Sequence, residues 1–422
     1  MRVKVFPSSV SSSINIPPSK SISHRAIICA CLSQGRSRIV NIAYSKDIMA
    51  TIGGMRALGA KITEYENYVV IEGIGEIKAN TPLWIDCNES GSTLRFFIPI
   101  FSLCNQKVTF WGQGRLLSRP QSIYQELFEK QELLFLQSDD SITIEGTLKA
   151  SEYELCGDIS SQFITGLLLA LPMLQGNSII KIKPPFESRS YVELTLQTMA
   201  EFGVVAQFID EHTISVTGNQ QYQATNYKVE GDFSQMAFYA VMAAINGNLT
   251  ILDMCQSSKQ GDKEIVEILR RFGAQIHSLE DSYSIQESKL FASDIDLSNC
   301  PDLGPILTVL CAFSEGESTI FNAVRLRIKE SDRIDAMETQ LKKLGVNISS
   351  TFDSITINGR NKMTGEVTVF AHNDHRIAMS LAVFAACSEY PVTIEGAECV
   401  EKSYPNFYED LKKIGVRLEI IE

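Results

Sequence analysis

The sequence predicts an α/β protein of two domains, each built from three repeated β-α units. The first observation is that a short polar loop runs into an unusually apolar helical stretch at intervals of about seventy residues. The second is that each stretch is followed by a β-like run and then by an amphipathic helix. The third is length, since 422 residues exceed one ordinary core and suit two domains of roughly 200 residues each.

The apolar helical stretches come first in each unit. They begin in or after polar loops at residues 20–25, 89–95, 160–162, 232–235, 301–302 and 373–376. Examples are AIICACLSQG, FITGLLLALPML and IAMSLAVFAACS, which are apolar on nearly every face and must be buried. If the units pack alike, the helix N-termini point the same way and offer unpaired N–H groups and partial positive charge. We therefore expect this assembly to bind anions.

A second loop and an amphipathic helix complete each unit. β-like runs such as SRIVNI, KVTFWG and LTILDM lead into loops that hold charged residues where a hairpin end should lie. Most of the helices behind these loops end in a near-identical phrase with glycine placed as a C-cap: RALGAKI, AEFGVVA, RRFGAQI, KKLGVNI and KKIGVRL. The second unit lacks this glycine, because its residues 126–136 read ELFEKQELLFL.

The two chain ends predict how the domains divide. The last unit stops at Glu422 without a final strand, whereas residues 1–18 contain RVKVF and SINI, strand-like segments that belong to no complete unit. We expect the N-terminus to complete the last unit. One domain would then be discontinuous, with residues 1–19 and 230–422, and a second domain, residues 20–229, would be inserted into it.

The composition excludes several function classes. The net charge of −12 argues against a general nucleic-acid binder, because phosphate contacts need a surplus of Lys and Arg. The longest apolar run, around residues 167–174, is far shorter than the roughly 20 residues of a membrane helix. Residues 1–10 contain no signal-peptide core. We expect a cytoplasmic protein that binds neither nucleic acid nor membrane.

Cysteine and histidine usage indicates no metal site. The ten cysteines form no CxxC pair, and the five histidines form no HxxxH or HExxH motif. Buried free thiols are the simpler interpretation for the cysteines that lie within apolar stretches, which are Cys29, Cys31, Cys104, Cys311 and Cys387.

The polar loops carry a resemblance that covers the whole chain. PPSKSISHRA at residues 17–26 is similar to the N-terminal signature of the 5-enolpyruvylshikimate-3-phosphate synthase family. Further segments agree with that family in order and spacing: ESGSTLR at 89–95, GQGRLLSRP at 112–120, GDISSQF at 157–163, ESRSYVELT at 187–195, VEGDFSQ at 229–235, PDLGPI at 301–306, RIKESDR at 327–333, NDHRIAMS at 373–380 and EKSYP at 401–405. The resemblance implies two domains of three repeats, an inside-out α/β barrel, with the active site in the cleft between them.

The resemblance also implies a reaction. Members of the family move the enolpyruvyl group of phosphoenolpyruvate to the 5-hydroxyl of shikimate 3-phosphate and release phosphate, on the pathway to chorismate and the aromatic amino acids. They need no metal and no cofactor. Both substrates are polyanions, so the chemistry requires fixed cations and N–H donors, together with one acid and one base. We expect a monomer whose partners are these two small anions.

The residues that the resemblance assigns to shikimate 3-phosphate come from several units. They are Lys20, Ser21, Arg25, Ser160, Ser161, Gln162, Ser188, Tyr191, Asp302 and Lys329. The spacing of four between Ser21 and Arg25 places both on one face of a helix. The structural alternatives are N-cap roles for the serines and a half-buried core position for Tyr191.

A second set is assigned to phosphoenolpyruvate by the same resemblance. It comprises Lys20, Gly91, Arg119, Gln162, Arg333, Arg376 and Lys402. The planar fork of arginine matches pairs of carboxylate and phosphate oxygens. Taken singly, each arginine could instead form a surface ion pair. Gly91 leaves room for a ligand, and family members with glycine here generally admit glyphosate in place of phosphoenolpyruvate.

Proton transfer is assigned to three residues, with Asp302 and Glu330 as the main pair and Lys20 sharing the work. In the family, the carboxylate that matches Asp302 accepts the proton of the 5-hydroxyl, and the one that matches Glu330 protonates the methylene carbon of phosphoenolpyruvate. An N-cap aspartate would explain Asp302 structurally. His375 is a weaker candidate, for which helix capping is the alternative.

Two positions depart from the familiar family pattern. Glu89 and Arg325 stand where asparagine is common, so no role is carried over to them.

One alternative function is that of the enolpyruvyl transferase that acts on UDP-N-acetylglucosamine, but no cysteine lies between Phe110 and Leu155 to match its reactive cysteine. RNA 3′-phosphate cyclase uses related repeats, and the acidic balance counts against it. A non-catalytic relative that senses an anion would be favoured if Asp302, Glu330 or Lys20 were absent.

Overall fold

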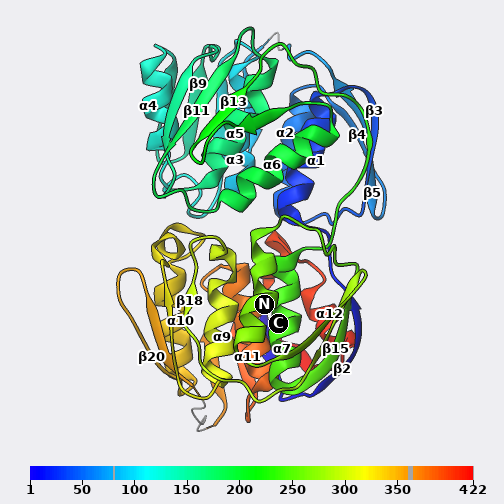
Figure 1. Cartoon of the computed structure of the whole chain (residues 1–422), viewed down its shortest axis with the longest axis vertical. Coiled ribbons are helices and arrows are strands. Elements are labelled where there is room, and N and C mark those ends of the chain that lie inside the picture. Colours follow the sequence, from blue (N-terminus) through cyan, green and yellow to red (C-terminus); the bar gives the residue numbers. More distant parts are fainter. Residues whose placement is uncertain (79–80, 360–364, 422) are drawn as a thin grey trace. The chain divides into compact units, whose positions relative to one another are not determined.

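The strands of the described chain form six sheets of four strands each. The structure is a computed structural model, and it describes residues 1–78, 81–359 and 365–421. The chain divides into two units, which Figure 1 shows with the chain coloured from end to end. We call Pro18–Val229 the inserted unit and Met1–Pro17 with Glu230–Glu422 the discontinuous unit.

One repeat describes every sheet. A strand is followed by a buried helix, a second strand, an outer helix, and two further strands. In the second repeat, β6 (Leu83–Asp86) runs parallel to β7 (Val108–Trp111), with Leu83 opposite Val108. β7 pairs antiparallel with β9 (Ser141–Glu145), which pairs antiparallel with β8 (Leu134–Gln137). The same order recurs in the other five sheets.

The inserted unit contains the first three repeats. Its helices are α1 (Lys20–Leu32), α2 (Lys46–Ala57), α3 (Gly91–Ser102), α4 (Ser122–Lys130), α5 (Ser161–Ala170), η1 (Leu171–Met173) and α6 (Arg189–Glu201). Its remaining strands are β3 (Gln34–Val40), β4 (Lys61–Glu64), β5 (Tyr68–Ile74), β10 (Glu152–Cys156), β11 (Ser178–Lys183), β12 (Ala206–Phe208), β13 (Thr213–Val216) and β14 (Asn226–Lys228).

The discontinuous unit contains the last three repeats. Its helices are α7 (Phe233–Asn246), η2 (Gly261–Glu264), α8 (Ile265–Arg271), η3 (Pro301–Leu303), α9 (Gly304–Phe313), η4 (Val324–Ile328), α10 (Arg333–Lys343), α11 (His375–Cys387), η5 (Ala397–Lys402) and α12 (Phe407–Lys413). Its strands are β1 (Arg2–Val5), β2 (Val10–Asn15), β15 (Gly247–Leu252), β16 (Gln275–Leu279), β17 (Ser282–Gln286), β18 (Ile295–Asp296), β19 (Glu317–Phe321), β20 (Asn347–Ser350), β21 (Ile355–Asn358), β22 (Val367–Phe370), β23 (Val392–Glu395) and β24 (Leu418–Ile421).

Three strands join repeats that the chain order separates. β1 lies between β23 and β24 and pairs antiparallel with both, so the N-terminal strand completes the last sheet. β2 runs parallel to β15 and supplies the first strand of the fourth repeat. β14 runs parallel to β3 and supplies the first strand of the first repeat. The RVKVF segment therefore belongs to the last repeat, and SINI belongs to the fourth.

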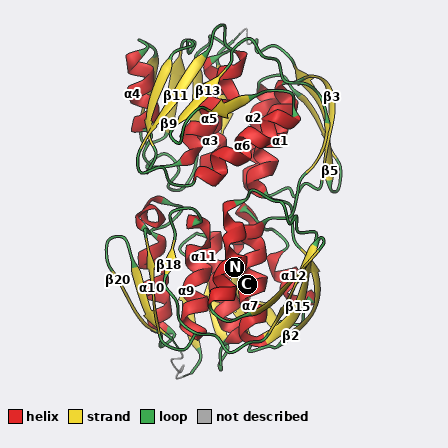
Figure 2. Ribbon diagram, viewed as in Figure 1, coloured by secondary structure: helices red, strands yellow, loops and turns green. Residues whose placement is uncertain are grey.

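The first helix of each repeat is buried along almost its whole length. In α9, every residue from Gly304 to Ala312 is buried, as its uniformly apolar sequence predicts. α3 packs on α5 in the inserted unit, whereas α7, α9 and α11 pack on one another in the discontinuous unit. Figure 2 shows, for each unit taken by itself, such helices in the middle and strands along the outer sides. Polar groups at the starts of these helices are therefore carried by rigid elements.

The polar segment at residues 20–25 is helical, as the spacing of Ser21 and Arg25 predicts. Lys20 is the first residue of α1. Part of the expected loops at 89–95 and 373–376 is likewise helical, since α3 begins at Gly91 and α11 at His375.

The second repeat closes its outer helix without glycine. Glu132 adopts φ 58°, the left-handed conformation that glycine adopts at the corresponding positions of the other repeats: Gly59, Gly203, Gly273, Gly345 and Gly415. The next N–H then bonds the carbonyl five residues earlier in all six repeats, as Leu133 does to Phe128 and Ala60 to Met55. The backbone of the repeat is thus retained although its sequence signal is lost.

The cysteines and the helix lengths match the sequence analysis. All ten cysteines are free, and Cys29, Cys31, Cys104 and Cys311 are buried, whereas Cys387 is partly buried. Over the described ranges, no helix combines the length and apolar character that crossing a membrane would require.

Candidate active site

The buried helices of the inserted unit begin with small polar residues. Ser90 caps α3 by accepting from the N–H of Thr93 at 3.2 Å, and Ser160 caps α5 by accepting from Gln162 at 3.3 Å. α1 starts after Ser19 without a side-chain cap. The first-turn N–H groups of α1 are therefore not satisfied by a capping side chain and suit an anion.

Lys20 and Gly91 lie at two of these helix starts. The Nζ atom of Lys20 lies 2.9 Å from Oδ2 of Asp47, the second residue of α2. A methyl group added at Gly91 would lie 3.0 Å from Nη1 of Arg119 and 3.5 Å from Oε1 of Gln162. The structure thus brings Gly91, Arg119 and Gln162 together. It corrects the expectation of open room at Gly91, because the space beside its backbone is filled by the arginine.

Gln162 is held by a residue that the sequence analysis did not select. Arg95 donates from Nη1 to Oε1 of Gln162 at 2.8 Å and from Nη2 to the carbonyl of Pro120 at 3.2 Å. The amide nitrogen of Gln162 donates to Ser92 Oγ at 3.0 Å. Arg95 therefore links α3 to α5 and to the end of the loop that carries Arg119. Its place four residues after Gly91, on the same helical face, was the available signal.

Arg25 is turned inward. Its guanidinium donates to Thr195 Oγ1 (2.8 Å), Thr165 Oγ1 (3.2 Å) and the carbonyls of Ser21 (2.6 Å) and Tyr191 (3.3 Å). Burial lowers the pKa of Arg25 to about 10, so it stays charged at neutral pH. Four of the five N–H groups of an arginine are thus engaged within the protein. Arg25 ties α1 to α5 and α6, which limits its direct contact with a ligand.

The remaining residues assigned to shikimate 3-phosphate lie at the starts of α1, α5 and α6. Ser21 is part-buried in the first turn of α1, and Ser161 is the buried first residue of α5. Ser188 is buried with φ 53° and ψ 36°, a left-handed conformation that is costly for serine. Tyr191 is partly buried, and its carbonyl accepts from Arg25 and Thr195. Strain concentrated at Ser188 is typical of functional positions.

Asp302 is the centre of a second cluster, in the discontinuous unit. Its Oδ1 atom lies 3.3 Å from Lys329 Nζ and 3.3 Å from Arg333 Nη1, and its Oδ2 atom lies 2.9 Å from Arg376 Nη2. Asp302 lies in the short helix η3, and neither η3 nor α9 has a side-chain cap. The N-cap alternative for Asp302 is therefore wrong, since its carboxylate pairs with Lys329 before α10 and with Arg333 and Arg376 in the first turns of α10 and α11.

Arg333 also pairs with two further carboxylates, those of Asp374 and Glu330. Its Nε atom lies 2.8 Å from Asp374 Oδ2, and its Nη2 atom lies 2.8 Å from Glu330 Oε2. Only 1% of the Arg333 side chain is exposed. Asp374 also caps α11 by accepting from the N–H of Arg376, and it accepts from Ser331 at 3.0 Å. Asp374 was not selected from the sequence, although it lies in the NDHR motif.

Three further cationic residues assigned to phosphoenolpyruvate are buried. Arg119, Arg376 and Lys402 are each no more than 7% exposed. Lys402 donates to the carbonyl of Asn373 at 2.7 Å. The alternative that Arg119, Arg333 and Arg376 form surface ion pairs is therefore wrong. His375 is the buried first residue of α11, and the helix cap is Asp374 rather than the histidine.

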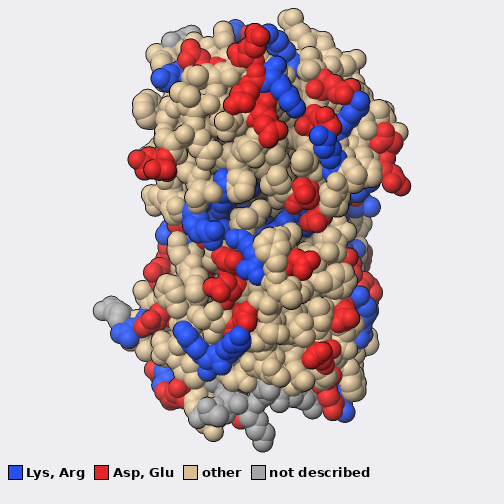
Figure 3. Space-filling view, turned by 90° about the vertical axis from the view of Figure 1, so that its left-hand side faces the viewer, with Lys and Arg blue, Asp and Glu red and all other residues tan. Residues whose placement is uncertain are grey.

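Electrostatics set the protonation of the Asp302 cluster. Burial alone would raise the pKa of Asp302, but Arg376, Lys329 and Arg333 outweigh it and hold this pKa well below its usual range. The same balance between burial and Arg333 lowers the pKa of Asp374. Burial lowers the pKa of Lys329, with Asp302 opposing that shift. On the face drawn in Figure 3, both cationic and acidic side chains are exposed, and the net charge of the chain is −12.

A further carboxyl lies next to this cluster. Asp262, in η2, is buried and accepts a short hydrogen bond from the hydroxyl of Ser234, in the first turn of α7. Burial, and then the charge of Asp302, raise the pKa of Asp262 to about 7. In the sequence, Gly261 and Asp262 lie in the charged loop that follows the β-like run LTILDM, and no role was assigned to them.

The two positions that depart from the family pattern both have structural partners. A Cβ at Gly114 would lie 2.8 Å from the carboxylate of Glu89, so glycine is needed there for this approach as well as for its φ of 58°. Glu89 thereby packs on the loop that leads to Arg119. Arg325 is buried and donates to the carbonyl of Ser298 at 2.6 Å.

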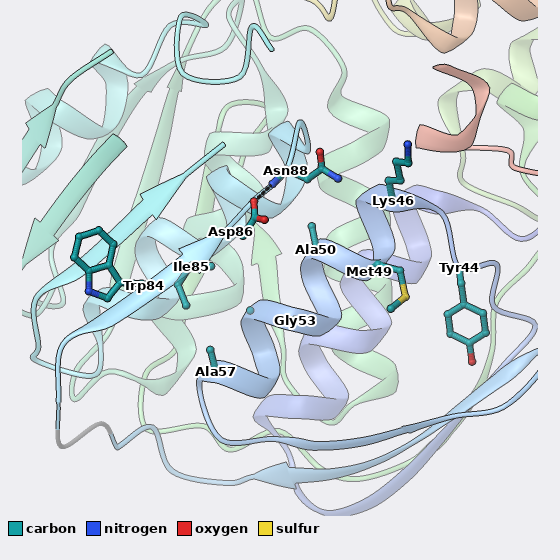
Figure 4. Close-up of a pocket in the computed structure, with 11 residues that line it drawn as sticks. Tyr44, Lys46, Met49, Ala50, Gly53, Ala57, Trp84, Ile85, Asp86 and Asn88 are labelled. Atoms are coloured by element: carbon teal, nitrogen blue, oxygen red, sulfur yellow. Dashed lines mark hydrogen bonds between the residues drawn. The ribbon is translucent and has the colours of Figure 1, made fainter. Parts of the chain in front are cut away.

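A separate hollow of about 500 Å³ lies between α2 and β6 (Figure 4). It is open because Ala50, Gly53 and Ala57 present almost no side chain along this face of α2. At its rim, Asp86 accepts from the N–H of Asn88 at 2.7 Å. None of the residues assigned to the substrates lines this hollow, so it is distinct from the Asp302 cluster and from the group of Gly91, Arg119 and Gln162.

Comparison with known proteins identifies the family that this geometry belongs to. The sequence pattern of EPSP synthase (3-phosphoshikimate 1-carboxyvinyltransferase) matches residues 6–411. The chain belongs to the EPSP synthase family. A 3-phosphoshikimate 1-carboxyvinyltransferase of Clostridium perfringens is 46% identical over 417 residues, which cover 98% of both chains. One of Clostridioides difficile is 45% identical over 428 residues, covering 99% of this chain and 98% of the relative.

Solved structures agree with this family member in fold. An EPSP synthase from Acinetobacter baumannii superposes with a TM-score of 0.84 at 24% sequence identity, with 100% of both chains covered. The enolpyruvyl transferase NikO from Streptomyces tendae superposes with a TM-score of 0.79 at 14% identity, covering 99% of this chain and 98% of NikO. The predicted architecture of repeated β-α units is therefore confirmed.

Proposed function

We propose that this family member is a 3-phosphoshikimate 1-carboxyvinyltransferase. It transfers the enolpyruvyl group of phosphoenolpyruvate to the 5-hydroxyl of shikimate 3-phosphate and releases phosphate. The observation that carries the proposal is the Asp302 cluster, in which one carboxylate pairs with Lys329, Arg333 and Arg376. Relatives that bear the name of this activity are 46% identical over 98% of the chain.

The cations of the clusters suit two polyanionic substrates. Arg119, Arg333, Arg376 and Lys402 are assigned to phosphoenolpyruvate, and buried charges of this kind give strong, directional bonds to carboxylate and phosphate. The starts of α5 and α6, with Ser160, Ser161 and Ser188, are assigned to shikimate 3-phosphate. A phosphate there would gain the N–H groups and the positive end of a helix as well as hydroxyls.

Two carboxylates are assigned to proton transfer. The 5-hydroxyl oxygen adds to C2 of phosphoenolpyruvate and gives its proton to Asp302, while Glu330 gives a proton to C3. The bond from C2 to the phosphate oxygen then breaks and phosphate leaves, while C3 returns a proton to the carboxylate of Glu330 and the double bond is restored. Arg333 contacts both carboxylates, so it holds the acid and the base in a fixed relation. Lys20 is assigned to share this work from the inserted unit.

A phosphate-release assay tests the activity. The purified chain is incubated with phosphoenolpyruvate and either shikimate 3-phosphate or UDP-N-acetylglucosamine. Turnover is expected with shikimate 3-phosphate as the acceptor and not with UDP-N-acetylglucosamine. Turnover only with the nucleotide sugar would make the chain the other enolpyruvyl transferase, and binding of shikimate 3-phosphate without turnover would make it an anion-sensing relative.

A cytoplasmic location and a monomeric state remain part of this proposal. They rest on the sequence alone. Size-exclusion chromatography with light scattering checks the second, since a monomer should elute with the mass of 46.9 kDa.

A further inference from the structure

Four buried side chains form a continuous hydrogen-bonded chain through the inserted unit. Nδ1 of His24 on α1 lies 2.7 Å from Oγ1 of Thr51 on α2, which lies 2.7 Å from Oγ1 of Thr93 on α3. Thr93 Oγ1 lies 2.7 Å from Oγ of Ser90, the cap of α3. All four side chains are fully buried. We call these residues the hydroxyl chain.

The Ser90 end of the hydroxyl chain and its neighbour Thr93 adjoin residues assigned to phosphoenolpyruvate. Ser90 immediately precedes Gly91, whose backbone lies against Arg119 and Gln162. The Thr93 hydroxyl also approaches the carbonyl of Asp47, whose carboxylate pairs with Lys20. His24 itself makes no contact with these groups. The family resemblance gives roles to other residues of the PPSKSISHRA motif but none to His24.

The hydrogen count assigns a tautomer to His24. Each hydroxyl has one proton to give. If Thr93 donates to Ser90, then Thr51 donates to Thr93, and Nδ1 of His24 must carry the proton that reaches Thr51. Nε2 is then an acceptor, and it has no partner in the buried site. The opposite direction would require Ser90 to donate to Thr93, whereas in the structure Thr93 donates to Ser90.

We propose that His24 is a positioning residue, whose Nδ1–H orients the hydroxyl chain and thereby holds Gly91 and the Lys20–Asp47 pair in place for phosphoenolpyruvate. The proposal rests on the function proposed above. His24 stays neutral in this role, because burial, and then the charges of Lys20 and Arg25, hold its pKa well below the usual value. It acts through other residues and does not touch the substrate.

Three variants separate hydrogen bonding from packing. Thr51→Val keeps the shape and breaks the chain in the middle. His24→Leu keeps most of the buried volume and removes the donor. His24→Asn loses volume but places an amide N–H close to the position of Nδ1. The matched control is Thr198→Val, since Thr198 is buried in the same unit and bonds only within its own helix, to the carbonyl of Leu194 at 2.8 Å.

The expected result is a rise in the KM for phosphoenolpyruvate of about tenfold in Thr51→Val and His24→Leu, the size expected when a buried hydrogen bond is lost. The KM for shikimate 3-phosphate and kcat should change by less than about threefold. His24→Asn should recover most of the KM although its Tm is the lower of the two His24 variants. Thr198→Val should match the wild type in KM.

Two outcomes overturn the proposal. One is an unchanged KM for phosphoenolpyruvate in Thr51→Val, and the other is a KM that follows Tm across all variants, the control included. Long-range proton–nitrogen NMR on the histidine rings gives an independent check, because the chain has only five histidines. An Nδ1–H tautomer for His24 is expected, and an Nε2–H tautomer would refute the assigned direction. A wild type without any turnover would instead count against the proposed function.

Discussion

Nη2 of Arg376 lies 2.9 Å from Oδ2 of Asp302, so a residue assigned to anion binding neutralises the carboxylate assigned to proton transfer. An incoming phosphate or carboxylate competes for the same guanidinium. Binding would then remove a positive neighbour from Asp302, and the pKa of Asp302 would rise toward a value at which it accepts a proton. We therefore expect substrate binding and activation of the base to be coupled through this pair.

Asp302→Asn should lower kcat by about a hundredfold or more, the usual scale for a general base. Affinity for inorganic phosphate should not fall, because the amide no longer neutralises Lys329, Arg333 and Arg376. Steady-state turnover and calorimetric titration with phosphate measure the two effects. Turnover near that of the wild type would remove Asp302 from proton transfer.

Glu330→Gln should separate chemistry from binding. We expect a loss in kcat of about a hundredfold or more, with little change in the dissociation constant for shikimate 3-phosphate, because Glu330 is not assigned to that substrate. Glu338→Gln is the control, since Glu338 lies on α10 and bonds Lys342 and Ser350 outside the cluster. Equal losses in the two variants would point to the fold of α10 rather than to proton transfer.

Gly91→Ala should weaken phosphoenolpyruvate and glyphosate together. The new methyl group would lie 3.0 Å from Nη1 of Arg119, which must shift. Competition kinetics should show glyphosate competing with phosphoenolpyruvate in the wild type, and both constants rising in the variant. Gly53→Ala is the control, because a Cβ there meets nothing within 4 Å. If the inhibition constant rose while the KM stayed fixed, the methyl would be acting on the inhibitor and not through Arg119.

Asp262→Asn should change how stability depends on pH. The pKa of Asp262, raised to about 7 by burial, lies above the value of about 3.9 in an unfolded chain. The folded state therefore holds an extra proton between these values, and stability is lost as the pH rises through about 7. The gain in Tm of the variant over the wild type should be larger at pH 8 than at pH 5. Calorimetry measures it, with exposed Asp139→Asn as the control, and equal gains at both pH values would contradict the assignment.

Glu132→Gly should stabilise the inserted unit. A left-handed residue other than glycine costs roughly 1–2 kcal/mol, and the greater freedom of glycine in the unfolded chain offsets about half of that. A net gain of about 0.5–1 kcal/mol corresponds to a rise in Tm of about 1–4 °C for a unit of this size. Glu126→Gly, in the middle of α4, should destabilise by about 1 kcal/mol. A lower Tm for Glu132→Gly would show that the Glu132 side chain makes a contact worth more than the strain.

Much of the fold follows from local signals in the sequence. The apolar stretches predicted the buried helices, and the glycine phrases predicted the ends of five outer helices, because each signal acts within a few residues. The motif order predicted the family. It also selected Asp302, Glu330, Arg333 and Arg376, which the structure brings into one cluster.

Only the tertiary structure decided how these residues are paired. Arg25 donates hydrogen bonds to two threonines that lie about 140 and 170 residues away in the sequence. Asp374 accepts a hydrogen bond from Arg333, and Arg119 occupies the space that a side chain at Gly91 would need. Glu132 takes a left-handed conformation that its residue type disfavours, at the point where Leu133 closes α4 and β8 begins to pair with β9. The reason is the same in each case. Helix and strand formation depends on neighbours in the chain, whereas a buried charge or a strained backbone is stabilised by partners that come together only when the repeats pack.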